Sequence, residues 1–208
     1  MLVNIAGIRI LGKANTYVTV WKFVTPTLTF ILLFTAFHSS NLTSYGGFSP
    51  LWVAPMFLAI PGAGIVFAYL RFRQALEYAG EGKNPQKDVP RALILSVVTA
   101  MGLYALLQLT FVGSINWSAA GITPRNWAGL ATSPWASGPL YQELAPSGIV
   151  ALGAFGVILL IDAYVSPSAT GGIYMGTSTR TFFGLATDGY FPKFFLRVNE
   201  QTGAPSWR

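Results

Sequence analysis

The sequence predicts an all-α integral membrane protein with four transmembrane helices, in a single transmembrane domain that covers residues 1–208. Hydrophobic residues make up 52% of the 208 residues and charged residues only 10%, against roughly 25% in soluble domains. The apolar residues fall in four blocks, each at least as long as the ~20 residues that a helix needs to cross a bilayer. Lysine and arginine lie almost entirely on one side of these blocks.

The four spans are expected at about residues 16–37, 51–75, 92–115 and 148–178. A membrane β-barrel is disfavoured because apolar and polar residues do not alternate in ~10-residue segments. A soluble bundle of buried helices is disfavoured because the blocks have no polar faces to contact water. The first block contains one charged residue, Lys22, and the fourth contains one, Asp162, whereas the third contains none.

The distribution of basic residues predicts the orientation of the chain. Eleven lysines and arginines lie on one side of the predicted spans, and only Arg125 lies in the loops on the other side. The eleven are Arg9, Lys13, Arg71, Arg73, Lys83, Lys87, Arg91, Arg180, Lys193, Arg197 and Arg208. The positive-inside rule then places both ends, the 76–91 loop and the 179–208 tail in the cytoplasm, and the 116–147 loop outside the cell. We therefore expect a multi-pass protein of the plasma membrane.

Four tryptophans are predicted near the outer membrane boundary, where interfacial anchoring explains them without a ligand. They are Trp52, Trp117, Trp127 and Trp135.

A lysine within the first span is a candidate coupling residue. Pro26 cannot donate a backbone hydrogen bond and so frees the carbonyl of Lys22, four residues earlier. An ammonium group within a span needs a polar partner, which favours a functional Lys22 that faces the protein interior. The alternative is that Lys22 extends along the span to the cytoplasmic interface.

The fourth span contains a second group of polar residues. Pro167 predicts a broken helix there, and Asp162, Ser166 and Thr170 follow one another at four-residue intervals. This spacing places the three side chains on one face of a helix, as a possible polar stripe. An acid within a span is a functional hypothesis by default; the alternative is a structural Asp162 near the outer leaflet. In the second span, the Pro61–Gly64 segment either breaks the helix or allows close packing, which is the commoner use of such glycines.

The sequence excludes several functional classes. There is no cysteine and only one histidine, His38, so neither a thiolate metal site nor paired histidines can form. No phosphate-binding glycine loop or nucleophile elbow is present. We therefore expect no enzyme activity, no metal, no cofactor and no nucleic-acid partner.

Two segments carry a resemblance to a known family. Residues 67–92 read FAYLRFRQALEYAGEGKNPQKDVPRA, with an aromatic-small-aromatic stretch followed by the pattern E-x-K-N-P-x-x-x-x-P. Residues 166–195 form the second segment, which contains an arginine, an Asp-Gly pair and a proline. Both resemble the amino acid permeases of the amino acid-polyamine-organocation superfamily, at the sixth and eighth helices. The pattern residues are Glu81, Lys83, Asn84, Pro85, Pro90, Arg180, Asp188, Gly189 and Pro192.

The resemblance implies a partial LeuT-like fold of two inverted five-helix repeats. The chain would be a fragment that runs from the end of the fourth helix to just after the eighth. Lys22 matches the basic residue that is linked to proton coupling in sodium-independent members. The implied substrate-binding residues are Phe67, Ala68, Tyr69, Leu70, Arg71 and Tyr174, and the expected coupling residues are Lys22, Asp162, Ser166 and Thr170. Arg71 and Arg73 depart from the glycine and the acid that the family commonly has there.

The expected function is therefore a part of a secondary active amino acid permease. It would move amino acids across the plasma membrane by alternating access, coupled to protons or by exchange, and its partners would be an amino acid, protons and the lipid bilayer. Missing helices or a partner chain are expected to be needed for activity. The alternative is a truncated or split membrane subunit, or a vestigial fragment, that transports nothing.

Overall fold

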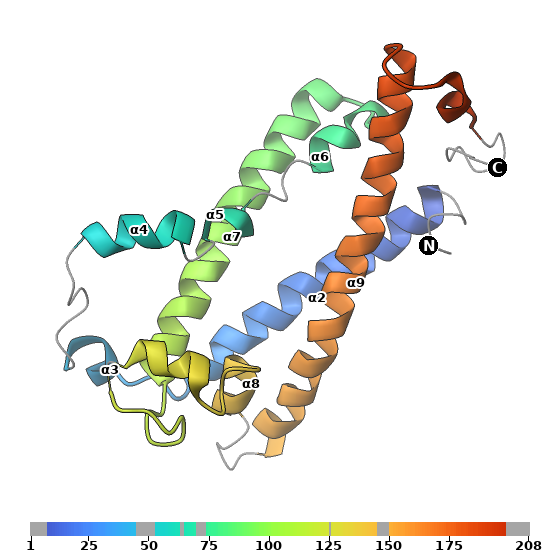
Figure 1. Cartoon of the computed structure of the whole chain (residues 1–208). Coiled ribbons are helices and arrows are strands. Elements are labelled where there is room, and N and C mark those ends of the chain that lie inside the picture. The colour runs from blue at the N-terminus through green and yellow to red at the C-terminus, as the bar shows by residue number, and fades with distance from the viewer. Residues whose placement is uncertain are drawn as a thin grey trace. The chain divides into compact units, whose positions relative to one another are not determined.

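The computed structural model describes residues 8–44, 53–62, 65–69, 74–124, 126–144 and 150–198 (Figure 1). The elements within these ranges are helices. The three longest are α2 (Ile8–Phe34), α7 (Pro85–Ser114) and α9 (Val150–Thr187). They contain the three segments that are long and apolar enough to cross a membrane, Asn15–Phe34, Pro85–Ser114 and Gly153–Thr187. The predicted all-helical membrane architecture is confirmed for these three spans.

Within the expected span at 51–75 the structure describes three helical segments, α4 (Ala54–Gly62), α5 (Ile65–Ala68) and α6 (Gln74–Glu77), and the span itself stays a prediction. Residues 51–52, 63–64 and 70–73 lie outside the described ranges. A Cβ added to Gly62 would meet no atom within 4 Å, so the described structure does not show close packing there.

The long helices extend beyond the apolar blocks. α7 begins at Pro85 rather than at residue 92, and α9 continues to Thr187 rather than ending at 178. Proline suits the first position of a helix, and Asp88 in the first turn interacts favourably with the helix dipole. Hydropathy detects only the apolar part of a helix, so it misses such polar turns.

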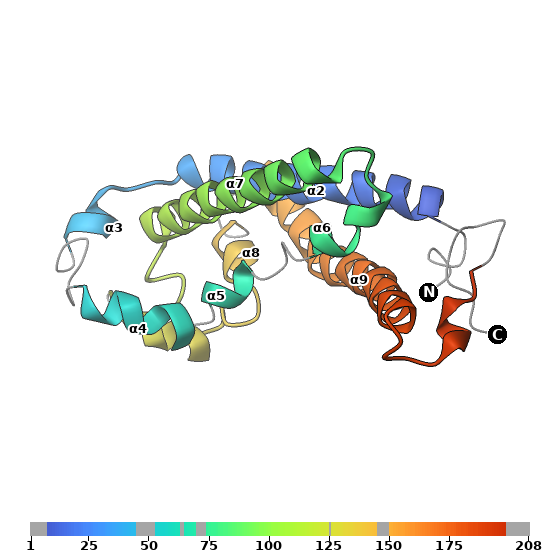
Figure 2. The same ribbon diagram turned by 90° about the horizontal axis from the view of Figure 1, so that it is seen from above.

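The predicted break in the fourth span is wrong. α9 runs through Pro167 as one helix of 38 residues, an uninterrupted ribbon in Figures 1 and 2. A proline removes a single bond from the backbone ladder, and the long apolar segments on both sides keep the remaining ladder intact.

The chain divides into two compact units. Unit 1 comprises Met1–Lys22, Phe67–Val98 and Val165–Arg208. Unit 2 comprises Phe23–Val66 and Thr99–Tyr164. Besides parts of the long helices, unit 1 contains α6, η2 (Ala79–Glu81) and η5 (Lys193–Leu196). Unit 2 contains α3 (Ser40–Thr43), α4, η3 (Trp127–Thr132) and α8 (Pro139–Leu144), and the boundary between the units falls within α5, after Val66.

In unit 1, Arg180 connects α9 to the segment between α6 and η2. Its Nη1 donates to Gly176 O at 2.8 Å, and its guanidinium carbon lies 4.3 Å from the centroid of the Tyr78 ring. Nearby in the sequence, the rings of Phe182, Phe191 and Phe195 contact one another with centroids 5.3 to 5.5 Å apart. These contacts fix the chain around the end of α9.

Unit 2 has two hydrophobic clusters. The first is formed by Leu33, Leu144 and Phe155. The second is formed by Ile115, Trp117, Ala120 and Trp135. Trp117 and Trp135 are only 7% and 3% exposed, so interfacial anchoring is wrong for these two residues. They pack inside the segment that follows α7, whereas Trp127 is partly exposed and Trp52 lies outside the described ranges.

Alanine substitutions at two glycines of α7 are expected to have opposite effects on stability. A Cβ at Gly113 would overlap the ring of Phe37, whereas a Cβ at Gly102 would meet no atom within 4 Å. We expect Gly113→Ala to lower the free energy of unfolding by ~1–3 kcal/mol through overpacking. Gly102→Ala, the matched control, should raise it by ~0.5–1 kcal/mol because alanine is the better helix former. Thermal unfolding in detergent measures both changes, and equal effects of the two variants would contradict the Phe37 contact.

Candidate functional site

The structure brings Lys22 and Thr170 together in unit 1. Lys22 Nζ donates to Thr170 Oγ1 at 3.1 Å, although the two residues are 148 positions apart in the sequence. Thr170 Oγ1 in turn donates to Ser166 O at 2.9 Å. All three residues are half-buried. The polar cluster Lys22–Thr170–Ser166 therefore joins α2 to α9.

This geometry bears on the two alternatives for Lys22. Its ammonium is directed to a hydroxyl of α9, which is the kind of polar partner that a cation within a span requires. Hydrogen bonds from a charged donor are shorter and stronger than neutral ones. The contact shows that Thr170 is a hydrogen-bond partner of Lys22, and a role of Lys22 in coupling remains a prediction.

The proposed polar stripe is only partly described by this cluster. Ser166 and Thr170 belong to unit 1, where the hydroxyl of Thr170 bonds back to the Ser166 carbonyl. Asp162 belongs to unit 2 and is half-buried on α9. A coupling role for Asp162 stays a prediction.

Of the expected substrate-binding residues, Phe67 and Ala68 lie on α5, Tyr69 on the turn after it and Tyr174 on α9. Phe67 is 67% exposed and Tyr174 is 45% exposed, so neither ring is enclosed by the described residues. Ala68 is exposed and Tyr69 is half-buried, whereas Leu70 and Arg71 lie outside the described ranges, as does Arg73. Substrate binding at these positions remains a prediction.

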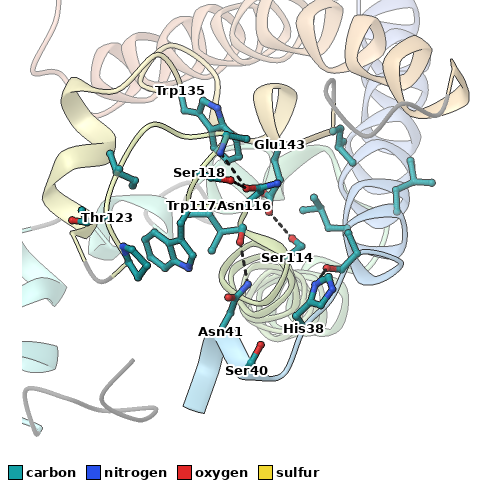
Figure 3. Close-up of a pocket in the computed structure, with 18 residues that line it drawn as sticks. His38, Ser40, Asn41, Ser114, Asn116, Trp117, Ser118, Thr123, Trp135 and Glu143 are labelled. Carbon is teal, nitrogen blue, oxygen red and sulfur yellow. Dashed lines mark hydrogen bonds between the residues drawn. The ribbon is translucent and has the colours of Figure 1, made fainter. Parts of the chain in front are cut away.

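Unit 2 contains a pocket of about 700 Å³ that the sequence did not predict (Figure 3). Its lining comes from the end of α2, from α3, from the end of α7 and the segment after it, and from α8. The residues that give it chemical character are His38, Asn41, Ser114, Trp117, Trp135 and Glu143. The pocket therefore combines hydrogen-bonding groups with one acid and two aromatic rings.

Asn41 stabilises one wall of this pocket by capping α7. Its Nδ2 donates to Gly113 O at 2.9 Å and to Ile115 O at 3.1 Å, and the backbone N–H of His38 also donates to Gly113 O at 2.9 Å. The last carbonyls of a helix lack partners within the helix. The segment around α3 supplies these partners and so closes the end of α7.

Glu143 is a pocket residue that the sequence did not single out. Its Oε1 lies 2.6 Å from Ser114 Oγ, and its Oε2 is buried without a hydrogen-bond partner in the described part of the chain (Figure 3). Burial raises the pKa of Glu143 to about 8, against the smaller opposite effect of the Ser114 hydroxyl when it donates to the carboxylate. The available signal was a lone acid in the 116–147 segment, but hydropathy gave no sign of its burial.

The titratable groups do not assemble into a metal site. No group of three or more histidine, cysteine, aspartate or glutamate side chains within the described ranges is arranged to hold a metal ion. The polar groups present are suited to hydrogen bonding and proton binding.

Comparison with known proteins decides the family. A family model described as "Amino acid permease" matches residues 1–207. The chain belongs to the amino acid permease family. This is a family of membrane transporters and not of enzymes.

The permease chain is similar to several curated proteins. It is 34% identical to the glutamate/serine transporter AimA of Bacillus subtilis (strain 168), over 98% of this chain and 36% of that protein. It is 30% identical to the aspartate-proton symporter of the same organism, over 98% of this chain and 38% of that protein. The chain thus spans little more than a third of the length of these relatives. No solved structure matches it.

Proposed function

We propose that this permease chain contributes helices to a secondary active transporter that moves amino acids across the plasma membrane by alternating access. Membership of the family supports an amino acid as the substrate. The family's LeuT-like fold supports a site near the middle of the membrane, where discontinuous helices commonly expose backbone groups to a ligand. In this proposal Phe67–Arg71 and Tyr174 contact the amino acid.

The observation that carries the proposal is the hydrogen bond from Lys22 to Thr170. It links two candidate membrane spans, and intramembrane cations are rare and commonly mark substrate or ion pathways. We propose that Lys22 couples transport to protons. In this proposal the hydroxyl of Thr170 accepts from Lys22, the carbonyl of Ser166 accepts from Thr170, and Asp162 is a further coupling residue. The printed name of one relative, an aspartate-proton symporter, supports proton coupling.

Uptake into proteoliposomes tests the proposal. The protein is reconstituted in the length in which the cell makes it, and labelled glutamate, serine and aspartate are supplied with and without an inward proton gradient. The relatives' names make these three amino acids the first to test. We expect saturable uptake that the gradient stimulates. Uptake that the gradient leaves unchanged would overturn proton coupling. No saturable uptake of these three amino acids by the protein reconstituted with its remaining helices would overturn the transporter proposal.

The proposed orientation, with both ends of the chain in the cytoplasm, has its own test. The chain has no cysteine, so single cysteines at positions 128 and 188 can be labelled with a membrane-impermeant maleimide in intact cells. Only the first should react before lysis, and labelling of the second would reverse the orientation.

Replacing Thr170 tests the contact with Lys22. Thr170→Val keeps the shape of the side chain but removes the hydroxyl, and we expect uptake to fall roughly tenfold, because a hydrogen bond to a charged group contributes ~1.5–3 kcal/mol. Thr170→Ser keeps the hydroxyl and is the matched control. Equal uptake by the valine and serine variants would show that this contact does not serve transport.

A further inference from the structure

Ser114 Oγ lies between two oxygen atoms at short distance. It is 2.6 Å from Thr110 O in the same helix and 2.6 Å from Glu143 Oε1 of α8. A backbone carbonyl can only accept a hydrogen bond, and a serine hydroxyl carries one proton. A proton shared between two acceptors makes longer contacts than a proton donated to one, so two O···O contacts of 2.6 Å favour a second proton.

The carboxyl group of Glu143 is the group at these contacts that can supply this proton. We propose that Glu143 is a proton-binding site, whose carboxylic acid donates to Ser114 Oγ while Ser114 donates to Thr110 O. The acid then ties α8 to the end of α7. Loss of the proton to water or buffer in the pocket leaves a carboxylate, and Ser114 can then donate to Thr110 or to Glu143 but not to both.

The surroundings of Glu143 favour the acid over the carboxylate. The described residues of unit 2 include no lysine or arginine, and the arginine in its sequence, Arg125, lies outside the described ranges. Besides Glu143, the described part of unit 2 has five titratable side chains. One of them, His38, lines the same pocket as Glu143. The others are Tyr104 on α7, Tyr141 on α8, and Asp162 and Tyr164 on α9. His38 Nδ1 lies 2.7 Å from the carbonyl oxygen of Ala36, a contact in which Nδ1 is the donor. Glu143 Oε2 is buried without a hydrogen-bond partner in the same part of the chain, and an anionic oxygen in that position is costly.

The proton site of Glu143 lies in the wall of the unit 2 pocket. Glu143 and Ser114 both line it, beside Trp117 and Trp135, so gain or loss of the proton changes the hydrogen bonding of its wall. In a proton-coupled permease Glu143 would be a second proton site besides Lys22. This link rests on the proposed function, whereas proton binding itself does not and is measured without transport.

Isotope-edited infrared spectroscopy measures the protonation of Glu143 directly. The chain contains four glutamates, and labelling them with carbon-13 shifts their carbonyl bands away from those of the aspartates. We expect the purified protein in lipid nanodiscs at pH 7 to show the band of a protonated glutamate. This band should disappear with an apparent pKa within about one unit of 8.

Two variants assign the band. Glu143→Gln should remove it, and His38→Gln, which alters the other titratable side chain of the pocket lining, should retain it. Absence of the band from the unmodified protein at pH 7 would overturn the proposal without relying on any variant, and so would a titration complete below pH 6. Persistence of the band in Glu143→Gln would assign the proton to another glutamate and would also overturn it.

Discussion

Lys22→Ala is expected to abolish the pH dependence of amino acid uptake and to lower uptake at least tenfold. The lysine supplies the cation of the first span and donates to Thr170 on α9. Alanine removes both the charge and the donor, and the loss of a charge-assisted hydrogen bond of ~1.5–3 kcal/mol corresponds to roughly a 10- to 100-fold change. Uptake measured from pH 5 to pH 8 in proteoliposomes checks the result.

Two further lysine variants separate the possible roles of the charge. Lys22→Arg keeps a cation that does not lose its proton, so it should retain a fixed positive charge while losing the pH dependence. Lys13→Ala removes an exposed lysine of α2 before the candidate span and serves as the matched control. If Lys22→Ala keeps the pH profile of the unmodified protein, the coupling role of Lys22 is refuted.

The free energy of unfolding of the unmodified protein is expected to decline between about pH 4.5 and pH 8, and Glu143→Gln is expected to remove this decline. The pKa of Glu143 is raised from 4.5 to about 8 in the folded chain. Within this window the unfolded chain has released the proton and the folded chain still holds it, so the free energy of unfolding falls as the pH rises. The stabilisation by the protonated Glu143 carboxyl group is fully present below about pH 4.5 and is lost once the pH passes about 8. The slope has an upper limit of ~1.4 kcal/mol per pH unit.

Thermal unfolding in detergent at several pH values measures this effect. Glutamine is neutral at every pH and similar in shape to the protonated acid, so the variant should be the more stable protein at pH 8, and the difference should vanish towards pH 4.5. Asp88→Asn, which replaces an exposed acid in the first turn of α7, should leave the slope in place. A slope that survives in Glu143→Gln but disappears in His38→Gln would assign the titration to the imidazole instead.

The positions of the membrane spans followed from local properties of the sequence. Apolar segments of sufficient length predicted the helices that contain Asn15–Phe34, Pro85–Ser114 and Gly153–Thr187. The helix ends were less predictable, because polar turns such as the one at Pro85 and Asp88 continue a helix beyond its apolar part. The break expected at Pro167 did not form, since one proline does not outweigh a long helix on each side.

The sequence by itself determined the helical membrane class, the exclusion of cysteine chemistry and the family to which the chain belongs, because hydrophobicity, composition and motif spacing are local quantities. It also singled out Lys22 and Thr170 as separate polar residues in apolar spans. Only the tertiary structure placed Lys22 Nζ 3.1 Å from Thr170 Oγ1, and only it buried Trp117, Trp135 and the carboxyl group of Glu143. Contacts between residues far apart in the chain, and the loss of water around an acid, depend on how distant segments pack, and no local pattern records that packing.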